Sequence, residues 1–256
     1  MTTLPEPLSA FAAPDATLLA ILAQADTQGN RYRQAVLGQQ ILPNSMEAIR
    51  VEMTYHSNAI EGSTLTLRDT QLVLEGLSPS AGKPLRELYE ARNHDRALRL
   101  MEQWAEAGPK PITEDQLRQV HRTIMTEIDD TGAGHYRTGR VLISGTRFVP
   151  PGSQKFAELL PRLLELSQGS GHLILRAAEL HYNLVAVHPF ADGNGRTARL
   201  MMNLLLLQHG YPLTIIPVER RPEYLAALES ANTGDGTPLV RFVAECVVGS
   251  VERLVG

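Results

Sequence analysis

The sequence predicts an all-α fold with a single β-hairpin, and three observations support this class. Apolar residues recur with a helical period along most of the 256-residue chain. Helix-ending signals separate these segments, as at Gly108 and Pro109. Only the stretch 131–151, which is rich in Gly and Thr, lacks the helical period.

The first expected helix is Ala16–Ala25, whose leucines and isoleucine lie on one side. A second helix is expected to begin with Asn44 or Ser45 as its N-cap. Its apolar residues continue to Ile60, and Gly62 stops it. Further helices are expected at 66–76, 85–107, 113–129, 153–167, 172–187, 195–209, 221–232 and 238–254.

The expected hairpin consists of two short apolar runs, Val141–Ile143 and Phe148–Val149, on either side of a Ser144-Gly145-Thr146 turn. No repeat, low-complexity tract or linker divides the sequence between Met46 and Leu254. We expect an N-terminal lead and helix over 1–43, an N-terminal helical region over 44–110 and a core domain over 111–256.

Composition excludes several classes of protein. The chain is 43% hydrophobic and 20% charged with a formal net charge of -4, which disfavours direct nucleic-acid binding. The most apolar run, Leu200–Leu207, is interrupted by Asn203 and is shorter than the ~20 residues of a membrane span. Cys246 is the single cysteine, which fits a reducing compartment. The segment Met1–Pro14 has no signal-peptide pattern, so we expect a cytoplasmic protein without a membrane partner.

The strongest candidate site is His188–Arg199, which reads HPFADGNGRTAR. Pro189 disfavours helical geometry at the residue before it, so the preceding helix should end and present the His188 imidazole at a loop mouth. Gly193 and Gly195 allow the backbone to approach a ligand closely. The next helix begins there with unpaired N–H groups and a positive dipole end. The loop therefore predicts a base beside an anion-binding turn.

Three charged side chains complete this pattern. Arg196 and Arg199 are three positions apart, hence on one helical face, and both can bind phosphate oxygens. Asp192 in a positive site is best explained as a ligand for Mg²⁺ that bridges phosphates. Singly, these features fit a turn, a helix end and a solvated face. Their combination within twelve residues favours a di- or triphosphate site, and the sequence contains neither a Walker nor a HExxH signature.

This segment resembles the Fic family pattern His-x-Phe-x-(Asp/Glu)-Gly-Asn-Gly-Arg-x-x-Arg at every specified position. The resemblance implies a Fic-type helical core with one β-hairpin flap. It also implies transfer of AMP from ATP to a hydroxyl side chain of a target protein. Gly195 supports this branch, because related Doc-type kinases carry lysine there and transfer phosphoryl groups.

The resemblance extends over residues 47–252. Gly134–Arg137 and Val141–Pro151 are similar to the family's flap region. The segment after position 221 is similar to the family's nucleotide-pocket segment, which implies that Tyr224 and Asn232 line the adenosine site.

A second motif, Ser57-x-x-x-Glu61-Gly62, resembles the inhibitory motif of Fic proteins that carry an N-terminal inhibitory helix. The surrounding segment 55–67 is most similar to the animal endoplasmic-reticulum Fic enzymes. By itself this pattern is a common helix ending. The resemblance implies that Glu61 pairs with Arg199 and displaces the γ-phosphate contact. A carboxylate and a phosphate can compete for one guanidinium, because both bind it through two oxygens.

The expected mechanism follows from these assignments. ATP lies along the loop with Mg²⁺, or Mn²⁺ in its place, held by Asp192 and the phosphates. Asn194 and nearby amides position the α-phosphate. Arg196 and Arg199 neutralise the departing pyrophosphate. A Ser, Thr or Tyr hydroxyl attacks, and neutral His188 takes its proton.

The expected partner is a target protein held in extended form by the flap at Val141–Phe148. A second copy of the chain is a further candidate partner, since homodimers are common in the family. Three alternative functions stay open. They are hydrolysis of an AMP–protein bond with water oriented by Glu61, transfer of another group such as UMP or phosphocholine, and a regulatory nucleotide-sensing module.

Overall fold

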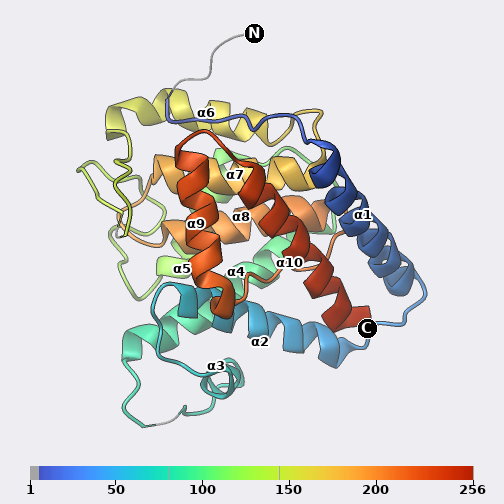
Figure 1. Cartoon of the computed structure of the whole chain (residues 1–256). Helices are drawn as coiled ribbons and strands as arrows, with labels where there is room; N and C mark the ends of the chain where they lie inside the picture. The colour runs from blue at the N-terminus through green and yellow to red at the C-terminus, as the bar shows by residue number, and fades with distance from the viewer. Residues whose placement is uncertain (1–5, 80, 144, 256) are drawn as a thin grey trace.

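The computed structural model describes residues 6–79, 81–143 and 145–255, and within these ranges the regular structure is helical, without a strand. Figure 1 shows the arrangement. The α-helices are α1 (Ala16–Leu37), α2 (Pro43–Ile60), α3 (Leu67–Leu74), α4 (Leu85–Ala105), α5 (Glu114–Met125), α6 (Phe156–Leu166), α7 (Leu173–Val187), α8 (Asn194–Gln208), α9 (Arg221–Asn232) and α10 (Thr237–Val255). Short 3-10 turns at Ser153–Lys155 and Val218–Arg220 precede α6 and α9. The all-α prediction is confirmed.

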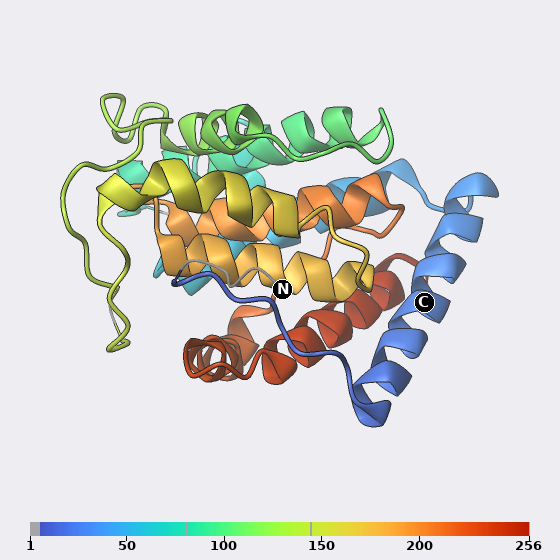
Figure 2. The same ribbon diagram turned by 90° about the horizontal axis from the view of Figure 1, so that it is seen from above.

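Helices α7 and α8 form the centre of the molecule and pack against each other. Helices α4 and α5 cover α8, α6 and α10 cover α7, and α1 lies along α10 (Figures 1 and 2). The segment Leu200–Leu206 of α8 is almost completely buried around its whole circumference. A helix that is apolar on every side belongs in a core. The loop between α7 and α8 is therefore anchored on both sides in the most buried part of the protein.

Three helix boundaries differ clearly from the sequence prediction. Helix α5 ends at Met125 rather than near Asp129, because the backbone leaves the helical conformation at Thr126, with ψ 135°. Helix α2 begins at Pro43 with Leu42 as its N-cap, so the predicted caps Asn44 and Ser45 lie inside the first turn. Proline suits that position because its φ is already helical and it lacks an N–H. Helix α1 extends beyond Ala25, because small and apolar residues continue to face the core up to Ala35.

The predicted β-hairpin has no strand among its described residues, and Ser144 at its turn lies outside them. This segment lies at the end of the molecule opposite α1 (Figures 1 and 2). Side chains hold it there. Thr146 Oγ1 donates to Glu229 Oε2 of α9 at 2.7 Å and accepts from the Phe148 backbone N–H at 3.0 Å. The hairpin stays a prediction.

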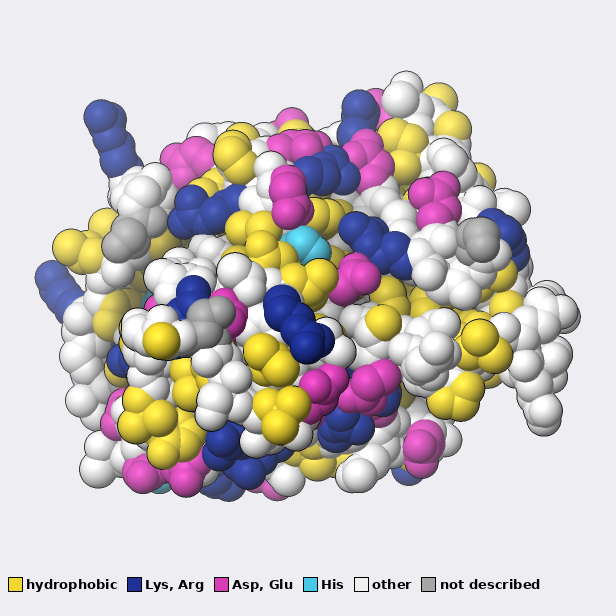
Figure 3. All heavy atoms as spheres, turned by 90° about the horizontal axis from the view of Figure 1, so that it is seen from below, with side chains coloured by type: hydrophobic (Ala, Val, Ile, Leu, Met, Phe, Trp, Pro, Cys, Tyr) yellow, Lys and Arg dark blue, Asp and Glu magenta, His cyan; other side chains and the backbone are white. Residues whose placement is uncertain are grey.

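Two surface properties bear on partners. On the face shown in Figure 3, basic and acidic side chains are interspersed rather than separated into patches of one sign. Among the helices that the structure describes, none combines the length and apolar character needed to span a membrane.

Candidate active site

His188 occupies the C-terminal cap of α7 in a left-handed conformation, with φ +49° and ψ 58°. Its backbone N–H donates to the Leu184 carbonyl at 3.0 Å and closes the last turn. Pro189 then prevents the helix from continuing. The imidazole is thus placed at the mouth of the loop, as the sequence predicts.

The hydrogen bonds of His188 define which ring nitrogen carries the proton. Nδ1 lies 3.2 Å from the Val185 carbonyl oxygen. Because a carbonyl can only accept, Nδ1 must be the protonated nitrogen and Nε2 keeps its lone pair. Burial lowers the pKa of His188 below its usual value of 6.5, so the ring is neutral at pH 7. Neutral His188 has the properties of a general base.

The shape of the loop depends on buried neutral groups. The Asn194 side chain accepts from the Phe190 backbone N–H and donates to the Phe190 carbonyl, both at 2.9 Å. The His121 ring stacks on Phe190 at 3.6 Å, and its Nε2 lies 3.0 Å from the Asp192 carbonyl. Burial lowers the pKa of His121 to about 4, which keeps it neutral. Asn194 thus stabilises the turn itself, and its predicted contact with the α-phosphate stays a prediction.

Arg137 joins the loop to the flap segment. Its Nε donates to the His188 carbonyl, Nη1 to Gly139 and Nη2 to Pro151, each at 2.7 Å. One buried guanidinium therefore fixes both ends of the segment 139–151 beside His188. From the sequence, Arg137 could be placed only before the flap, because its partners are backbone carbonyls with no sequence signature.

Two glycines form the anion-binding turn. Gly193 is the N-cap of α8 with φ +72°, and its N–H donates to Asp192 Oδ1 at 2.6 Å. At Gly195 a Cβ atom would lie 2.3 Å from Glu61 Oε1, so only glycine accommodates that carboxylate. The first N–H groups of α8 have no acceptor within the helix and attract anions. The backbone therefore has the shape expected of the cradle, and anion binding there stays a prediction.

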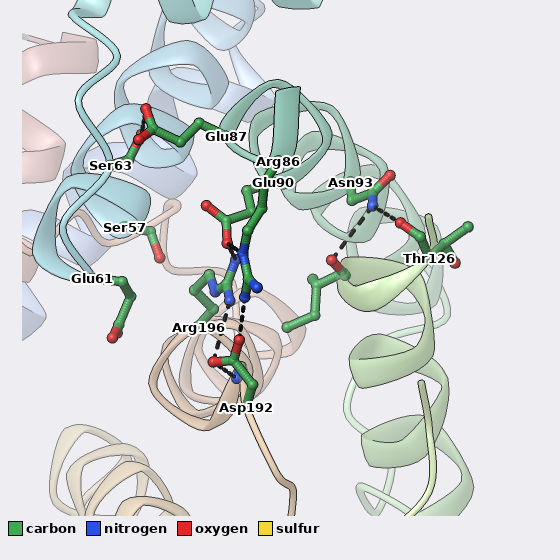
Figure 4. Close-up of polar contacts among 12 residues, drawn as sticks. Ser57, Glu61, Ser63, Arg86, Glu87, Glu90, Asn93, Thr126, Asp192 and Arg196 are labelled. Atoms are coloured by element: carbon green, nitrogen blue, oxygen red, sulfur yellow. Dashed lines mark hydrogen bonds and ion pairs between the residues drawn. The ribbon is translucent and has the colours of Figure 1, made fainter. Parts of the chain in front are cut away.

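Arg199 pairs with α2. Its Nη2 lies 2.7 Å from Glu61 Oε1 and donates to the Ser57 carbonyl at 2.8 Å, while Nε donates to Ser57 Oγ at 3.0 Å. Ser57 and Glu61 are adjacent on one side of α2 (Figure 4). Burial opposes ionisation of Glu61, but the charge of Arg199 prevails and lowers the pKa of that carboxyl. Gly62, at φ +101°, ends the helix immediately afterwards. The predicted pairing of these distant residues is therefore observed.

Charged residues of α4 contact the other side of the loop (Figure 4). Arg196 Nη1 lies 3.1 Å from Glu90 Oε1, and Arg86 forms an ion pair with Asp192. Arg86 and Glu90 could not be predicted from the sequence, because charges on an amphipathic helix resemble a solvated face. Asp192 is held ionised: burial opposes its charge, but Arg196 lowers its pKa.

The residues present fit a Mg²⁺ ion that the nucleotide helps to bind. No cluster of three or more His, Cys, Asp or Glu side chains suited to a metal occurs in the described part of the chain. Asp192 is a single ionised carboxylate, half exposed, beside the anion-binding turn. Mg²⁺ commonly takes one or two carboxylates and completes its shell with phosphates and water.

The two residues expected at the adenosine site have different positions. A cavity of about 280 Å³ lies between the flap segment, α7 and α9, and Asn232 lines it. Tyr224 is buried elsewhere, with its hydroxyl 2.9 Å from His181 Nε2. The next residue, Leu225, lines the cavity instead, since neighbouring helical side chains point about 100° apart. The remaining lining residues are Ile143, Gly145, Thr146, Phe148, Tyr182, Val185, Ala186, Ala226, Leu228 and Glu229.

Comparisons with known proteins agree with this geometry. Residues 111–206 match the Fic/DOC family. Protein adenylyltransferase fic-1 of Caenorhabditis elegans is 40% identical over 207 residues, which are 79% of this chain and 40% of that protein. Protein adenylyltransferase Fic of Drosophila virilis is 41% identical over 197 residues, 75% of this chain and 40% of that protein. The chain thus spans less than half the length of these curated relatives.

Solved structures give the same assignment. Fic-1 of C. elegans, as a fragment, has a TM-score of 0.83 and 32% identity, covering 94% of this chain and 72% of that one. A Fic-domain signalling protein from Bacteroides thetaiotaomicron has a TM-score of 0.79 and 27% identity, covering 91% of this chain and 94% of that one. Fold and site define a helical protein with a glycine turn at a helix N-terminus beside a neutral histidine. The chain belongs to the Fic/DOC family.

Proposed function

We propose that this chain is a protein adenylyltransferase that transfers AMP from ATP to a Ser, Thr or Tyr hydroxyl of a target protein. The observation that carries the proposal is the position of His188, with a free Nε2 lone pair, beside the glycine turn and the two arginines of α8. The names of the C. elegans and Drosophila relatives support the same activity.

ATP would lie with its base in the cavity lined by Asn232 and its phosphates along the start of α8. His188 Nε2 would take the proton of the target hydroxyl as its oxygen bonds to the α-phosphorus. The bond from that phosphorus to the bridging oxygen breaks, and pyrophosphate leaves. Arg196 and Arg199 would stabilise the charge that accumulates there.

Asp192 would hold Mg²⁺, or Mn²⁺, together with the phosphate oxygens. When bound, the ion would neutralise phosphate charge. The Gly193 N–H donates to Asp192 Oδ1 and thereby fixes the orientation of this carboxylate.

The flap segment Val141–Phe148 would hold the target. Added strands bind by main-chain hydrogen bonds, so such a segment orients a side chain with little demand on local sequence. Arg137 supports this proposal, because it fixes both ends of the segment next to His188.

Glu61 would act as an autoinhibitory residue. Its carboxylate binds the guanidinium of Arg199, which the γ-phosphate needs. Arg199 is almost fully buried and stays in place, whereas 41% of the Glu61 side chain is exposed. The Glu61 carboxylate is therefore the partner that can move away from Arg199. We call this inhibitory contact the Glu61 brake.

The same exposure favours a second candidate activity, hydrolysis of an AMP–protein bond. Part of the Glu61 side chain is exposed, and an ionised carboxylate can orient a water molecule. Incubation of AMP-modified target with the parent chain and Mg²⁺ or Mn²⁺ distinguishes the two reactions. Release of AMP that requires Glu61 supports hydrolysis.

Intact-mass analysis of the Glu61→Gly variant with ATP and cell lysate tests the proposed function. An AMP adduct on the variant or on a lysate protein is expected. The matched control is Glu61→Gly combined with His188→Ala, which keeps the open site and removes the base. Equal adduct formation by both variants contradicts the proposed mechanism.

A further inference from the structure

The first turns of α4 carry a set of charges that the proposed reaction does not use. Arg86 pairs with Asp192 Oδ2, and its Nε lies 3.1 Å from Glu90 Oε1. Glu90 Oε1 lies 3.1 Å from Arg196 Nη1, and Arg196 Nη2 lies 3.7 Å from Asp192 Oδ1. Figure 4 shows these four side chains facing one another. They form a closed ring of alternating charge over the loop.

Arg86 occupies the oxygen of Asp192 that a cation would use. Oδ1 already accepts the Gly193 N–H at 2.6 Å, so Oδ2 is the more available oxygen. The Arg86 guanidinium binds that oxygen. A metal ion bound directly to Oδ2 needs the same lone pairs. The guanidinium and the cation therefore compete for one position.

Exposure separates the two arginines of the ring. The Arg196 side chain is 4% exposed, and its partner Glu90 is 13% exposed. The Arg86 and Asp192 side chains are 56% and 50% exposed. Ion pairs at such exposure are weak because water screens them. Arg86 can leave Asp192 while Arg196 stays in place.

Arg86 is held at this position by its neighbour in the sequence. Glu87 Oε2 accepts from the Thr64 backbone N–H at 2.8 Å and from Ser63 Oγ at 3.2 Å. These two residues directly follow Gly62, so one turn of α4 holds the segment after Glu61 and also supplies Arg86. Figure 4 shows Glu87 and Ser63 in contact beside Arg86.

We propose that Arg86 competes with the divalent cation for Asp192 and forms a second brake, separate from Glu61. Glu61 withholds Arg199 from the γ-phosphate, and Arg86 withholds Asp192 from the cation. This inference rests on the proposed role of Asp192 as the metal carboxylate. The concentration of the divalent cation, and not only that of the nucleotide, then sets the fraction of the protein in which Arg86 has left Asp192.

The test is direct binding of Mn²⁺, followed by the electron paramagnetic resonance signal of free Mn²⁺, in the presence of a non-hydrolysable ATP analogue. All variants carry Glu61→Gly so that the first brake is absent. Arg86→Gln is expected to bind Mn²⁺ about twofold to fivefold more tightly, which corresponds to the loss of one exposed ion pair. Unchanged or weaker binding overturns the proposal.

Arg92→Gln is the matched control. It lies on the same helix, is exposed and removes the same charge, but its guanidinium faces the Tyr89 ring at 5.8 Å rather than Asp192. Any tightening that both variants share reports long-range electrostatics. A gain in Arg86→Gln no larger than in Arg92→Gln overturns the proposal.

Two further measurements separate the remaining outcomes. Binding of the analogue without metal should be unchanged in Arg86→Gln, and a loss there would make Arg86 a phosphate ligand instead of a competitor. Asp192→Asn should lose Mn²⁺ binding. If it binds as the parent does, the proposed metal role of Asp192 fails and the inference fails with it. If Asp192→Asn loses binding while Arg86→Gln is unchanged, the inference alone fails.

Discussion

The loop 188–199 has a floor and a rim that are held by different kinds of interaction. The floor consists of Phe190, Asn194 and His121, which are buried and bind backbone groups or stack without net charge. Arg137 adds a guanidinium that binds backbone carbonyls only. None of these contacts uses the charged side chains of Asp192, Arg196 or Arg199.

The rim consists of charged side chains paired with residues from α2 and α4. Arg199 pairs with Glu61, Arg196 with Glu90 and Asp192 with Arg86. Each contact uses a group proposed to bind the nucleotide or its metal. The difference teaches that neutral and backbone contacts hold the shape of the loop, whereas the rim groups proposed to bind a nucleotide or its metal are each paired with a charged side chain of the protein.

The largest effect is expected when the base is removed and the floor is kept. His188→Ala should lower AMP transfer by about 10²- to 10⁴-fold, the usual contribution of general base catalysis. Transfer of labelled AMP in the Glu61→Gly background measures it. The thermal midpoint should change little. Labelling equal to that of the Glu61→Gly protein rules out His188 as the base.

Removing one rim partner should activate the site. Glu61→Gly is expected to raise self-modification by about 5- to 150-fold, the range of typical coupling free energies between sites. The matched control is Glu219→Gly, an exposed glutamate away from the loop. A Glu61→Gly protein as inactive as the parent would show that the pair with Arg199 is structural.

Breaking the floor should affect stability rather than regulation. Asn194→Ala leaves the buried N–H and carbonyl of Phe190 without partners, so the free energy of unfolding should fall by about 1–3 kcal/mol. Urea unfolding measures this change. Asn232→Ala, at a less buried asparagine, should change it by no more than about 0.5 kcal/mol. Equal losses in both variants would show that the two Asn194 hydrogen bonds do not stabilise the floor more than an ordinary asparagine does elsewhere.

The effect expected to be smallest at pH 7 concerns the buried histidine near Arg199. Burial, with a further contribution from Arg199, lowers the pKa of His94 to about 3. The unfolded chain binds this proton near pH 6.5 and the folded chain does not, so stability is retained above pH 6.5 and falls as the pH decreases towards 3. The free energy of unfolding should therefore depend less steeply on pH in His94→Gln, by about 1.4 kcal/mol per pH unit between pH 6 and 4.

Urea unfolding at pH 7, 6, 5 and 4 provides the measurement for His94→Gln. His209→Gln, at a less buried histidine, is the control. A slope equal to that of the parent in His94→Gln would mean that His94 is protonated in the fold or that the site opens readily to water.

Most of the fold could be predicted from the sequence because apolar period and capping residues are local signals. Thr66 and Thr113 cap α3 and α5 through capping boxes, as their sequences indicate. The full length of α1 could not be predicted, because contacts with the core maintain it. Gly29, for example, packs against the ring of Tyr211.

The site was predicted unevenly for the same reason. His188 and the glycine turn follow from spacing within one segment. The pair Glu61–Arg199 could be expected only from the family resemblance, because it joins residues of different helices. Arg86 has no such signal, since nothing local in α4 distinguishes an arginine that faces a carboxylate of the loop from one that faces water.

The missing side chain of Gly195 has a consequence for how this protein can change by mutation. The space beside its Cα is filled by the Glu61 carboxylate, and a Cβ there would lie 2.3 Å from it. If the phosphates use the same space, a larger residue at 195 expels inhibitor and substrate together. Single substitutions that remove the inhibition by Glu61 but preserve the phosphate site must then arise at the end of α2. The evolutionary routes to a permanently active protein are therefore few, and they lie far from the loop in sequence.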